Sequence, residues 1–181
     1  METILEQAVR MCGNVKSRQT KMRDNAIVTI EEIIESNHLL ENKILVVQLT
    51  PNNSVDKNLT GLIANELMSK YQRPVLILNY KEDEEKRITW EGSGRGYEKS
   101  RLSNFRGFLL DTGLVEWAEG HANAFGCCIK NENLARFIAV TNYLLCNFDF
   151  SPVYKTDFIY RFDQLNKTDI ISLASYEELW G

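Results

Sequence analysis

The sequence contains few residues that could build a metal site or a disulfide framework. It has four cysteines and two histidines among 181 residues, and no two cysteines have the Cys-x-x-Cys spacing of a zinc site. We therefore expect the cysteines to be reduced packing residues, namely Cys12, Cys127, Cys128 and Cys146. Because the aspartates are scattered, no carboxylate-rich site for two metal ions can be assembled, and we expect no metal ligands in this chain.

Long apolar runs and an excess of basic residues are also missing. No apolar stretch approaches the length of a membrane span, and the N-terminus is charged rather than a secretory signal. We therefore expect a cytoplasmic protein with no membrane partner. The net charge of -4 argues against a protein that coats nucleic acid through bulk charge, because nonspecific affinity comes mainly from phosphate neutralisation. Any nucleic-acid site must be local.

The sequence has the pattern of one α/β domain preceded by a long helix. With 44% hydrophobic and 25% charged residues, the chain can build one well-packed core. Helical spacing without proline predicts one long helix or two over residues 2–36. A buried strand at 44–49, a helix at 58–71 and a strand at 75–79 predict a βαβ-like unit. We predict an α/β fold with a mixed sheet flanked by helices.

The rest of the chain is predicted to alternate helices and strands, with a hairpin loop at 81–86. We predict helices at 104–110, 115–120, 133–145 and 169–179, and strands at 87–91, 127–130 and 156–162.

The first of two glycine-rich motifs is GSGRG, residues 92–96. Such glycines can adopt positive φ and bring backbone N–H groups close to an anion. Arg95 adds a planar guanidinium that matches phosphate oxygens bidentately, and Ser93 adds a hydroxyl. Short glycine motifs recur by chance, so a hairpin turn with a solvated arginine is an equal alternative.

The second motif is EGHANAFG, residues 119–126, predicted to be a glycine-bounded link between a helix and a strand. His121 lies among small residues, so its ring is accessible to donate a hydrogen bond to phosphate or to shuttle a proton near neutral pH. The alternative is a histidine that binds a local backbone carbonyl, which we favour for His38.

Basic side chains cluster around the first motif, where only Glu91 and Glu98 oppose them. They are Arg87, Arg95, Lys99, Arg101 and Arg106. Tyr97 lies in the same stretch and could stack a base, which adds about 1–3 kcal/mol in single-strand binders. The alternative is a solvated basic surface with Tyr97 anchored in the core. Trp90, Trp117 and Trp180 are expected in the core or at interfaces.

The order of these motifs resembles the C-terminal, substrate-binding domain of DHH-family phosphoesterases, and most closely that of RecJ-type single-strand exonucleases. The likeness begins with GLIANELMSKYQRPVLIL at 61–78 and continues through both glycine-rich motifs. Asn14, Arg18 and Gln19 resemble an element of the family's connector helix. Gly96 and Glu119 depart from the family, which usually has serine and glycine there.

The resemblance implies a domain plan. Residues 1–40 would be the connector helix region, 41–150 the DHH-associated nucleic-acid-binding domain, and 151–181 the start of a C-terminal extension. In this family an N-terminal DHH domain holds two divalent metal ions, Mn²⁺ or Mg²⁺, and no Asp-His-His occurs here. We therefore expect this chain alone to be inactive. It could be a fragment, or a short protein whose catalytic partner is a separate chain.

The resemblance also implies a function. The chain would be the substrate-binding portion of a RecJ-like, metal-dependent exonuclease of DNA repair and recombination, with single-stranded DNA and the DHH domain as partners. His121 would be the catalytic residue. The substrate-binding residues would be Ser93, Gly94, Arg95, Tyr97, Arg101, Gly120 and Asn123. The alternatives are an oligoribonucleotide or cyclic-dinucleotide phosphodiesterase domain and a noncatalytic nucleic-acid-binding module.

Overall fold

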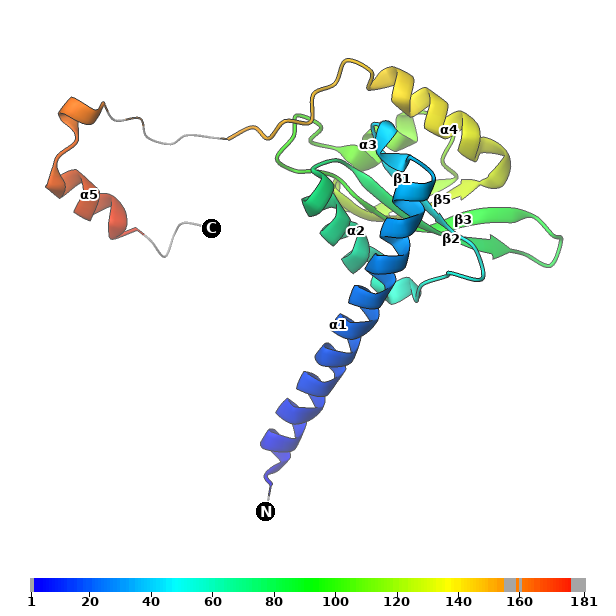
Figure 1. The fold of residues 1–181 in the computed structure, drawn as a ribbon, viewed down its shortest axis with the longest axis horizontal. Helices are drawn as coiled ribbons and strands as arrows, with labels where there is room; N and C mark the ends of the chain where they lie inside the picture. The colour runs from blue at the N-terminus through cyan, green and yellow to red at the C-terminus, as the bar shows by residue number, and fades with distance from the viewer. Residues whose placement is uncertain (1, 155–158, 160, 177–181) are drawn as a thin grey trace.

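A computed structural model describes residues 2–154, 159 and 161–176, and its centre is a five-stranded sheet (Figure 1). The strand order is β1-β2-β3-β5-β4. The strands are β1 (Leu45–Leu49), β2 (Val75–Glu82), β3 (Ile88–Arg95), β4 (Trp117–Gly120) and β5 (Ala124–Lys130). Because β1 and β2 are parallel and the other pairs are antiparallel, the predicted mixed sheet is confirmed.

Helices flank this sheet, as predicted. They are α1 (Ile4–Ser36), α2 (Lys57–Tyr71), α3 (Phe105–Asp111), α4 (Asn131–Leu144) and α5 (Lys167–Ala174), with 3₁₀ turns at Leu39–Glu41 and Phe162–Gln164. Side-chain oxygens cap the first turns of α2 and α3, where Asp56 accepts from the Asn58 N–H at 2.8 Å and Asn104 accepts from the Gly107 N–H at 2.9 Å. These caps satisfy backbone donors that have no partner inside the helix.

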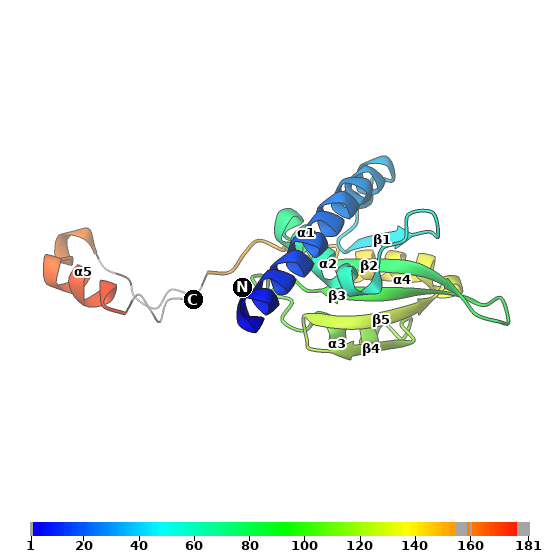
Figure 2. The same ribbon diagram turned by 90° about the horizontal axis from the view of Figure 1, so that it is seen from below.

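The long N-terminal helix is a single helix whose first two thirds are exposed. A capping box between Thr3 and Glu6 begins α1. Its buried residues, Ile30 and Ile34, lie near its C-terminal end, and the earlier part of α1 extends away from the sheet (Figures 1 and 2). Among the described residues, no helix has both the length and the apolar character of a membrane-spanning segment.

Two separate cores cover the two faces of the sheet. On one face α3 and α4 pack through Phe105, Leu109 and Phe137 on strand residues that include Phe125 and Cys127. On the other face α1 and α2 pack on β1 and β2, and every strand residue of that core belongs to these two strands. β3, β5 and β4 contribute no residue to that core, although α2 also contacts β3 where Thr60 meets Ser93, and Figure 2 shows β4 at the opposite edge of the sheet from α1.

Two predicted elements around the glycine-rich motifs are wrong. Residues 117–120, predicted as helical, form the edge strand β4, because pairing with β5 overrides the helix preference of Glu and Ala. GSGRG is not a turn after a strand, since Gly92 to Arg95 belong to β3, and Gly92, Gly94 and Gly96 do not have positive φ. Close packing explains two of these glycines: a Cβ on Gly92 would lie 1.8 Å from the Ile77 carbonyl oxygen, and one on Gly94 would lie 2.5 Å from the Phe125 ring.

The tail is only partly described. The strand predicted at 156–162 falls largely on residues outside the described ones, and its last residue begins a 3₁₀ turn. The helix predicted at 169–179 corresponds to α5, which ends at Ala174, and residues 177–181, including Trp180, are not described. The four cysteines are free thiols, but only Cys127 and Cys128 are buried, so Cys12 and Cys146 are exposed rather than packed.

Candidate nucleic-acid interface

Arg95 ends β3 as a half-buried cation. Its Nη1 donates to the Gly94 carbonyl at 2.8 Å, and desolvation by burial lowers the pKa of its guanidinium. The group stays charged, because an arginine pKa remains far above neutrality. Within the described part of the chain no carboxylate forms an ion pair with Arg95. A partly desolvated cation with most of its donors unused is suited to bind an anion.

Helix α2 lies directly against this arginine. A Cβ on Gly61 would lie 2.7 Å from Arg95 Nη2, so the glycine provides the space that the guanidinium fills. One residue earlier, the Thr60 hydroxyl donates to the Lys57 carbonyl at 2.8 Å and lies 2.9 Å from Ser93 Oγ. Because a hydroxyl has one proton, Ser93 must be the donor to Thr60, and it has no proton left for a phosphate. Ser93 thus fixes β3 to α2 in this structure.

The EGHANAFG motif is the tip of the β4–β5 hairpin rather than a link from a helix. Gly120 has φ +131°, and a Cβ there would lie 2.8 Å from the Ala124 carbonyl oxygen, so both the conformation and the space require glycine. The next residue closes the turn, since the His121 N–H donates to the Ala124 carbonyl at 2.9 Å. The His121 side chain is exposed at this tip.

Asn123 connects the hairpin tip to two other segments. Its Nδ2 donates to the Ser103 carbonyl at 3.0 Å, and its Oδ1 accepts from the Phe105 N–H at 3.2 Å, at the start of α3. Its backbone carbonyl accepts from the Gly96 N–H at 2.9 Å. The side chain of Asn123 therefore positions the hairpin beside the end of β3, and its amide groups already have partners.

Arg106 is a second cation near the hairpin tip. Its backbone N–H donates to the Ala122 carbonyl at 2.9 Å, which places the first turn of α3 next to His121. Its Nε is buried and has no hydrogen-bond partner among the described residues. Buried polar groups normally have partners, so this donor is an exception among the described residues. The burial of this one atom could not be predicted from the sequence, where a solvated basic surface was the alternative for the whole cluster.

A cavity of about 340 Å³ opens beside Arg95, between α2 and the end of β3. Its size is within the usual range for small-ligand sites. It is lined by Asn65, Met68, Ser69 and Gln72 of α2, by Arg95 to Lys99, and by Asn123 and Ala124. Of the predicted substrate-binding residues, this cavity brings together Arg95, Tyr97 and Asn123.

The remaining predicted residues have other surroundings. Tyr97 is only 5% exposed, so its ring is a packing group and leaves little surface for a stacked base. Gly94 is buried against Phe125, whereas Arg101 is exposed on the loop before α3. The structure therefore does not support Tyr97 as a base platform, because stacking requires an accessible ring face.

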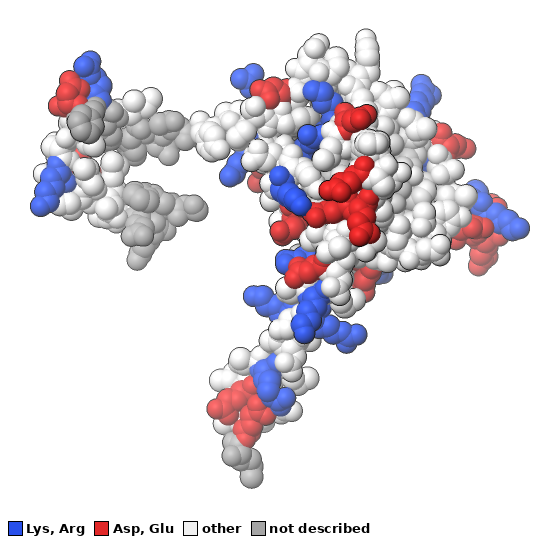
Figure 3. Space-filling model, viewed as in Figure 1, with Lys and Arg blue, Asp and Glu red and all other residues white. Residues whose placement is uncertain are grey.

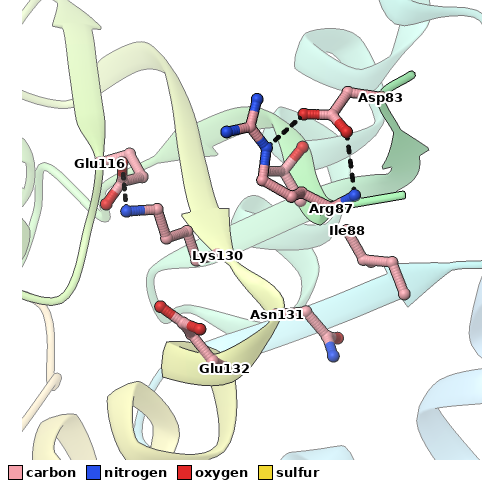
Figure 4. Close-up of a pocket in the computed structure, with 8 residues that line it drawn as sticks. Asp83, Arg87, Ile88, Glu116, Lys130, Asn131 and Glu132 are labelled. Atoms are coloured by element: carbon pink, nitrogen blue, oxygen red, sulfur yellow. Dashed lines mark hydrogen bonds and ion pairs between the residues drawn. The ribbon is translucent and has the colours of Figure 1, made fainter. Parts of the chain in front are cut away.

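A larger cavity of about 760 Å³ lies at the other end of β3 and is shown in Figure 4. Its cations already have acidic partners: Arg87 Nε lies 2.7 Å from Asp83 Oδ2, and Lys130 Nζ lies 3.0 Å from Glu116 Oε2 (Figure 4). Paired charges of this kind offer less to an incoming phosphate than the unpaired Arg95. We therefore place the candidate site at the Arg95 end of the strand.

The charge distribution agrees with a local site. Acidic and basic side chains are interspersed over the face in Figure 3, and acidic ones gather where α1 crosses the sheet. The described residues contain no group of three or more His, Cys, Asp and Glu side chains that could hold a metal ion. What the geometry at Arg95 offers is hydrogen-bond donors and positive charge.

Sequence comparison identifies relatives, although no family model matches the chain. A prophage-derived protein of Bacillus subtilis (strain 168), named the single-strand DNA-specific exonuclease YorK, is 38% identical over 180 residues, covering 99% of this chain and 31% of that protein. The single-stranded-DNA-specific exonuclease RecJ of the same organism is 31% identical over 157 residues, covering 80% of this chain and 18% of that protein. The chain thus spans about a third or less of the length of these relatives.

Comparison with solved structures shows the same fold in RecJ. The structure of RecJ from Thermus thermophilus in complex with Mn²⁺ matches with a TM-score of 0.58 and 14% identity, over 95% of this chain and 23% of that one. Its complex with Mg²⁺ matches with a TM-score of 0.53 and 16% identity, over 83% of this chain and 21% of that one. The resemblance that the ordered motifs predicted is confirmed.

Proposed function

Because this chain is a sequence relative of the RecJ-type single-strand DNA exonucleases, we propose that it is the substrate-binding portion of such an enzyme. It would hold the phosphates of single-stranded DNA while a metal-binding DHH domain hydrolyses the strand. The observation that supports this role is Arg95, a half-buried cation that forms no ion pair with a carboxylate of the described residues and lies at the rim of a cavity of about 340 Å³.

The surroundings of Arg95 explain how it would bind a phosphate. The guanidinium lies against Gly61, and its Nη1 donates a hydrogen bond to the Gly94 carbonyl. This bond uses only one of its five N–H donors. A pre-positioned fork loses little side-chain entropy on binding. Partial burial also strengthens its attraction to an anion, because the effective dielectric constant is lower than in bulk water.

The hairpin tip would provide the second group of contacts. His121 is exposed at the tip, and the Arg106 cation belongs to the neighbouring first turn of α3. In the proposal His121 donates a hydrogen bond to the scissile or adjacent phosphate and stabilises charge that develops there. Gly120 and Asn123 act by holding the tip in place, and Arg101 on the nearby loop contributes long-range attraction.

The proposal assigns a role to each part of the chain and places metal binding in a DHH domain. Residues 1–40 would be the connector helix region, 41–150 the nucleic-acid-binding domain and 151–181 the start of an extension. The described residues do not fit a pair of metal ions, because they contain no suitable cluster of ligands. In the proposal, Mn²⁺ or Mg²⁺ is held by a DHH domain, and the residues described here bind and orient the strand.

The test is the fluorescence anisotropy of a labelled single-stranded oligonucleotide titrated with the chain at fixed low salt. We expect Arg95→Ala to weaken binding about 10- to 150-fold, since a hydrogen bond to a charged group contributes about 1.5–3 kcal/mol. Arg87→Ala is the matched control, because Arg87 lies just before the other end of β3 and is already paired with Asp83 and Glu85. Equal effects of the two substitutions would show that Arg95 has no special role.

A further inference from the structure

The register of the sheet places a tryptophan on the same face as Arg95. Residues that pair directly in an antiparallel sheet point to the same face. Arg95 pairs with Ala124, and four residues along β5 Cys128 pairs with both Glu91 and Trp117. Because side chains alternate along a strand, Trp117 and Arg95 share one face. This is the face on which β3, β5 and β4 lie outside the core under α1 and α2.

The surroundings of Trp117 differ from those of a tryptophan in the core. It is 39% exposed, and a Cβ on Gly126 would lie only 3.4 Å from its Cζ3, so the indole rests over a glycine of the neighbouring strand. No hydrogen bond of its indole N–H occurs among the described residues. Trp90, by contrast, is 7% exposed, and its Nε1 donates to Asn131 Oδ1 at 2.8 Å.

The part of β5 between Arg95 and Trp117 has small side chains on this face of the sheet. On β5, Ala124 and Gly126 have a small side chain or none, so no bulky side chain of that strand rises along this line, while α2 lies over Ser93 beside it. The two Cα atoms are about 16 Å apart, from four residues at about 3.3 Å along the strand and two strand spacings of about 4.8 Å across it. A short single strand can bridge this distance.

The charges on this face favour a base over a phosphate near Trp117. Glu91 is paired with Lys81 at 2.6 Å, and Glu116 with Lys130 at 3.0 Å. Glu119 is exposed, faces the same side opposite Gly126 and has no ion pair in the described part of the chain. Its carboxylate would repel a phosphate, whereas it can accept a hydrogen bond from the amino group of a base.

We propose that Trp117 is the platform on which an unpaired nucleobase stacks when a phosphate of the same strand is bound at Arg95. The inference rests on the proposed function and adds a subsite to it. Every base has a π-face, so the platform accepts any sequence. It rejects a duplex, because paired bases are already stacked on each other, and it therefore gives the site its selectivity for single strands.

The test uses the ¹⁵N-labelled chain of 181 residues and the indole N–H signals in NMR spectra, which also detect weak binding. The probes are a thymidine tetranucleotide and an abasic tetramer with the same number of phosphates. We expect the tetranucleotide to shift the Trp117 signal, assigned from Trp117→Phe, and to leave the buried Trp90 signal unmoved. The abasic tetramer should leave both signals in place, because it has no base to stack.

Affinities of variants complete the test. Trp117→Ala should weaken binding of the tetranucleotide about tenfold, equivalent to about 1.4 kcal/mol, without changing affinity for the abasic tetramer. Trp117→Phe should keep most of the affinity, since it keeps an aromatic face. Tyr143→Ala is the matched control, because Tyr143 is 78% exposed on α4, which packs on the other face of the sheet.

Three results would overturn the inference. If Arg95→Ala weakens binding of the tetranucleotide but the Trp117 signal does not move, the phosphate site stands and the platform is wrong. If Trp117→Ala weakens binding of both tetramers equally, its effect is structural rather than through stacking. If neither tetramer binds at millimolar concentration, both the platform and the proposed function fail.

Discussion

Replacing Gly61 with alanine should make the protein more stable and a poorer binder of single strands. Gly61 lies inside α2, where glycine is unfavourable because it loses more backbone entropy than alanine. The new Cβ would lie 2.7 Å from Arg95 Nη2, which is too close, and its next neighbours are 3.5 Å or more away. The end of a flexible side chain can move aside, so the helix should accept alanine while Arg95 is displaced.

The two effects have different magnitudes that can be measured separately. Alanine in place of glycine in a helix interior stabilises by about 0.5–1 kcal/mol, which raises the melting temperature by about 1–4 °C in a protein of this size. Displacing the guanidinium should weaken one charge-assisted hydrogen bond to phosphate, which contributes about 1.5–3 kcal/mol. We therefore expect about tenfold weaker binding together with a higher melting temperature.

The assay pairs thermal unfolding with fluorescence anisotropy on a labelled single-stranded oligonucleotide. Gly13→Ala is the matched control, because Gly13 also lies within a helix but a Cβ there meets nothing within 4 Å. It should leave binding unchanged. If Gly61→Ala binds the strand as tightly as the wild type, the position of Arg95 does not matter for binding and the reasoning is refuted.

Four further predictions concern the hairpin and the cysteines. Gly120→Ala should destabilise the fold by about 1–3 kcal/mol because of its positive φ and the nearby carbonyl, and by more than Gly113→Ala, which has open space, in urea unfolding. Asn123→Ala should lower the free energy of unfolding by about 1–3 kcal/mol, because it leaves two backbone groups without partners. Burial raises the pKa of Cys127 to about 12, so its thiol should resist alkylation at pH 8 while exposed Cys12 reacts, and comparable rates would contradict this. Since that pKa is higher in the folded than in the unfolded state, the stabilising contribution is complete below pH 9 and is lost as pH rises toward 12.

The sequence predicted the elements that have strong local signals. The βαβ unit of β1, α2 and β2 follows from apolar runs and from Pro74, and the long helix α1 follows from proline-free helical spacing. It failed at β4, where Ala118 and Glu119 prefer helices but lie in an edge strand because β5 pairs with them. The prediction of a turn at GSGRG was also wrong, because the sequence does not distinguish a glycine that permits close packing in a strand from a glycine that permits a turn.

The surroundings of the candidate site could be predicted only in part, because they too depend on contacts between segments that are far apart in the sequence. Arg95 and His121 were predicted because their residue types suit phosphate chemistry, and their roles stay predictions. The hydroxyl of Ser93 is used by Thr60, and Tyr97 is buried, and neither fact can be read from the sequence. The relation of Trp117 to Arg95 depends on the register of three strands, which no local pattern specifies.

The most direct test of a phosphate site at Arg95 is a crystal structure of the chain with a short single-stranded oligonucleotide. Our account predicts a phosphate within hydrogen-bond distance of the Arg95 guanidinium, in the cavity between α2 and the end of β3. A strand bound instead at the cavity lined by Asp83 and Arg87, or on the face covered by α3 and α4, would contradict it.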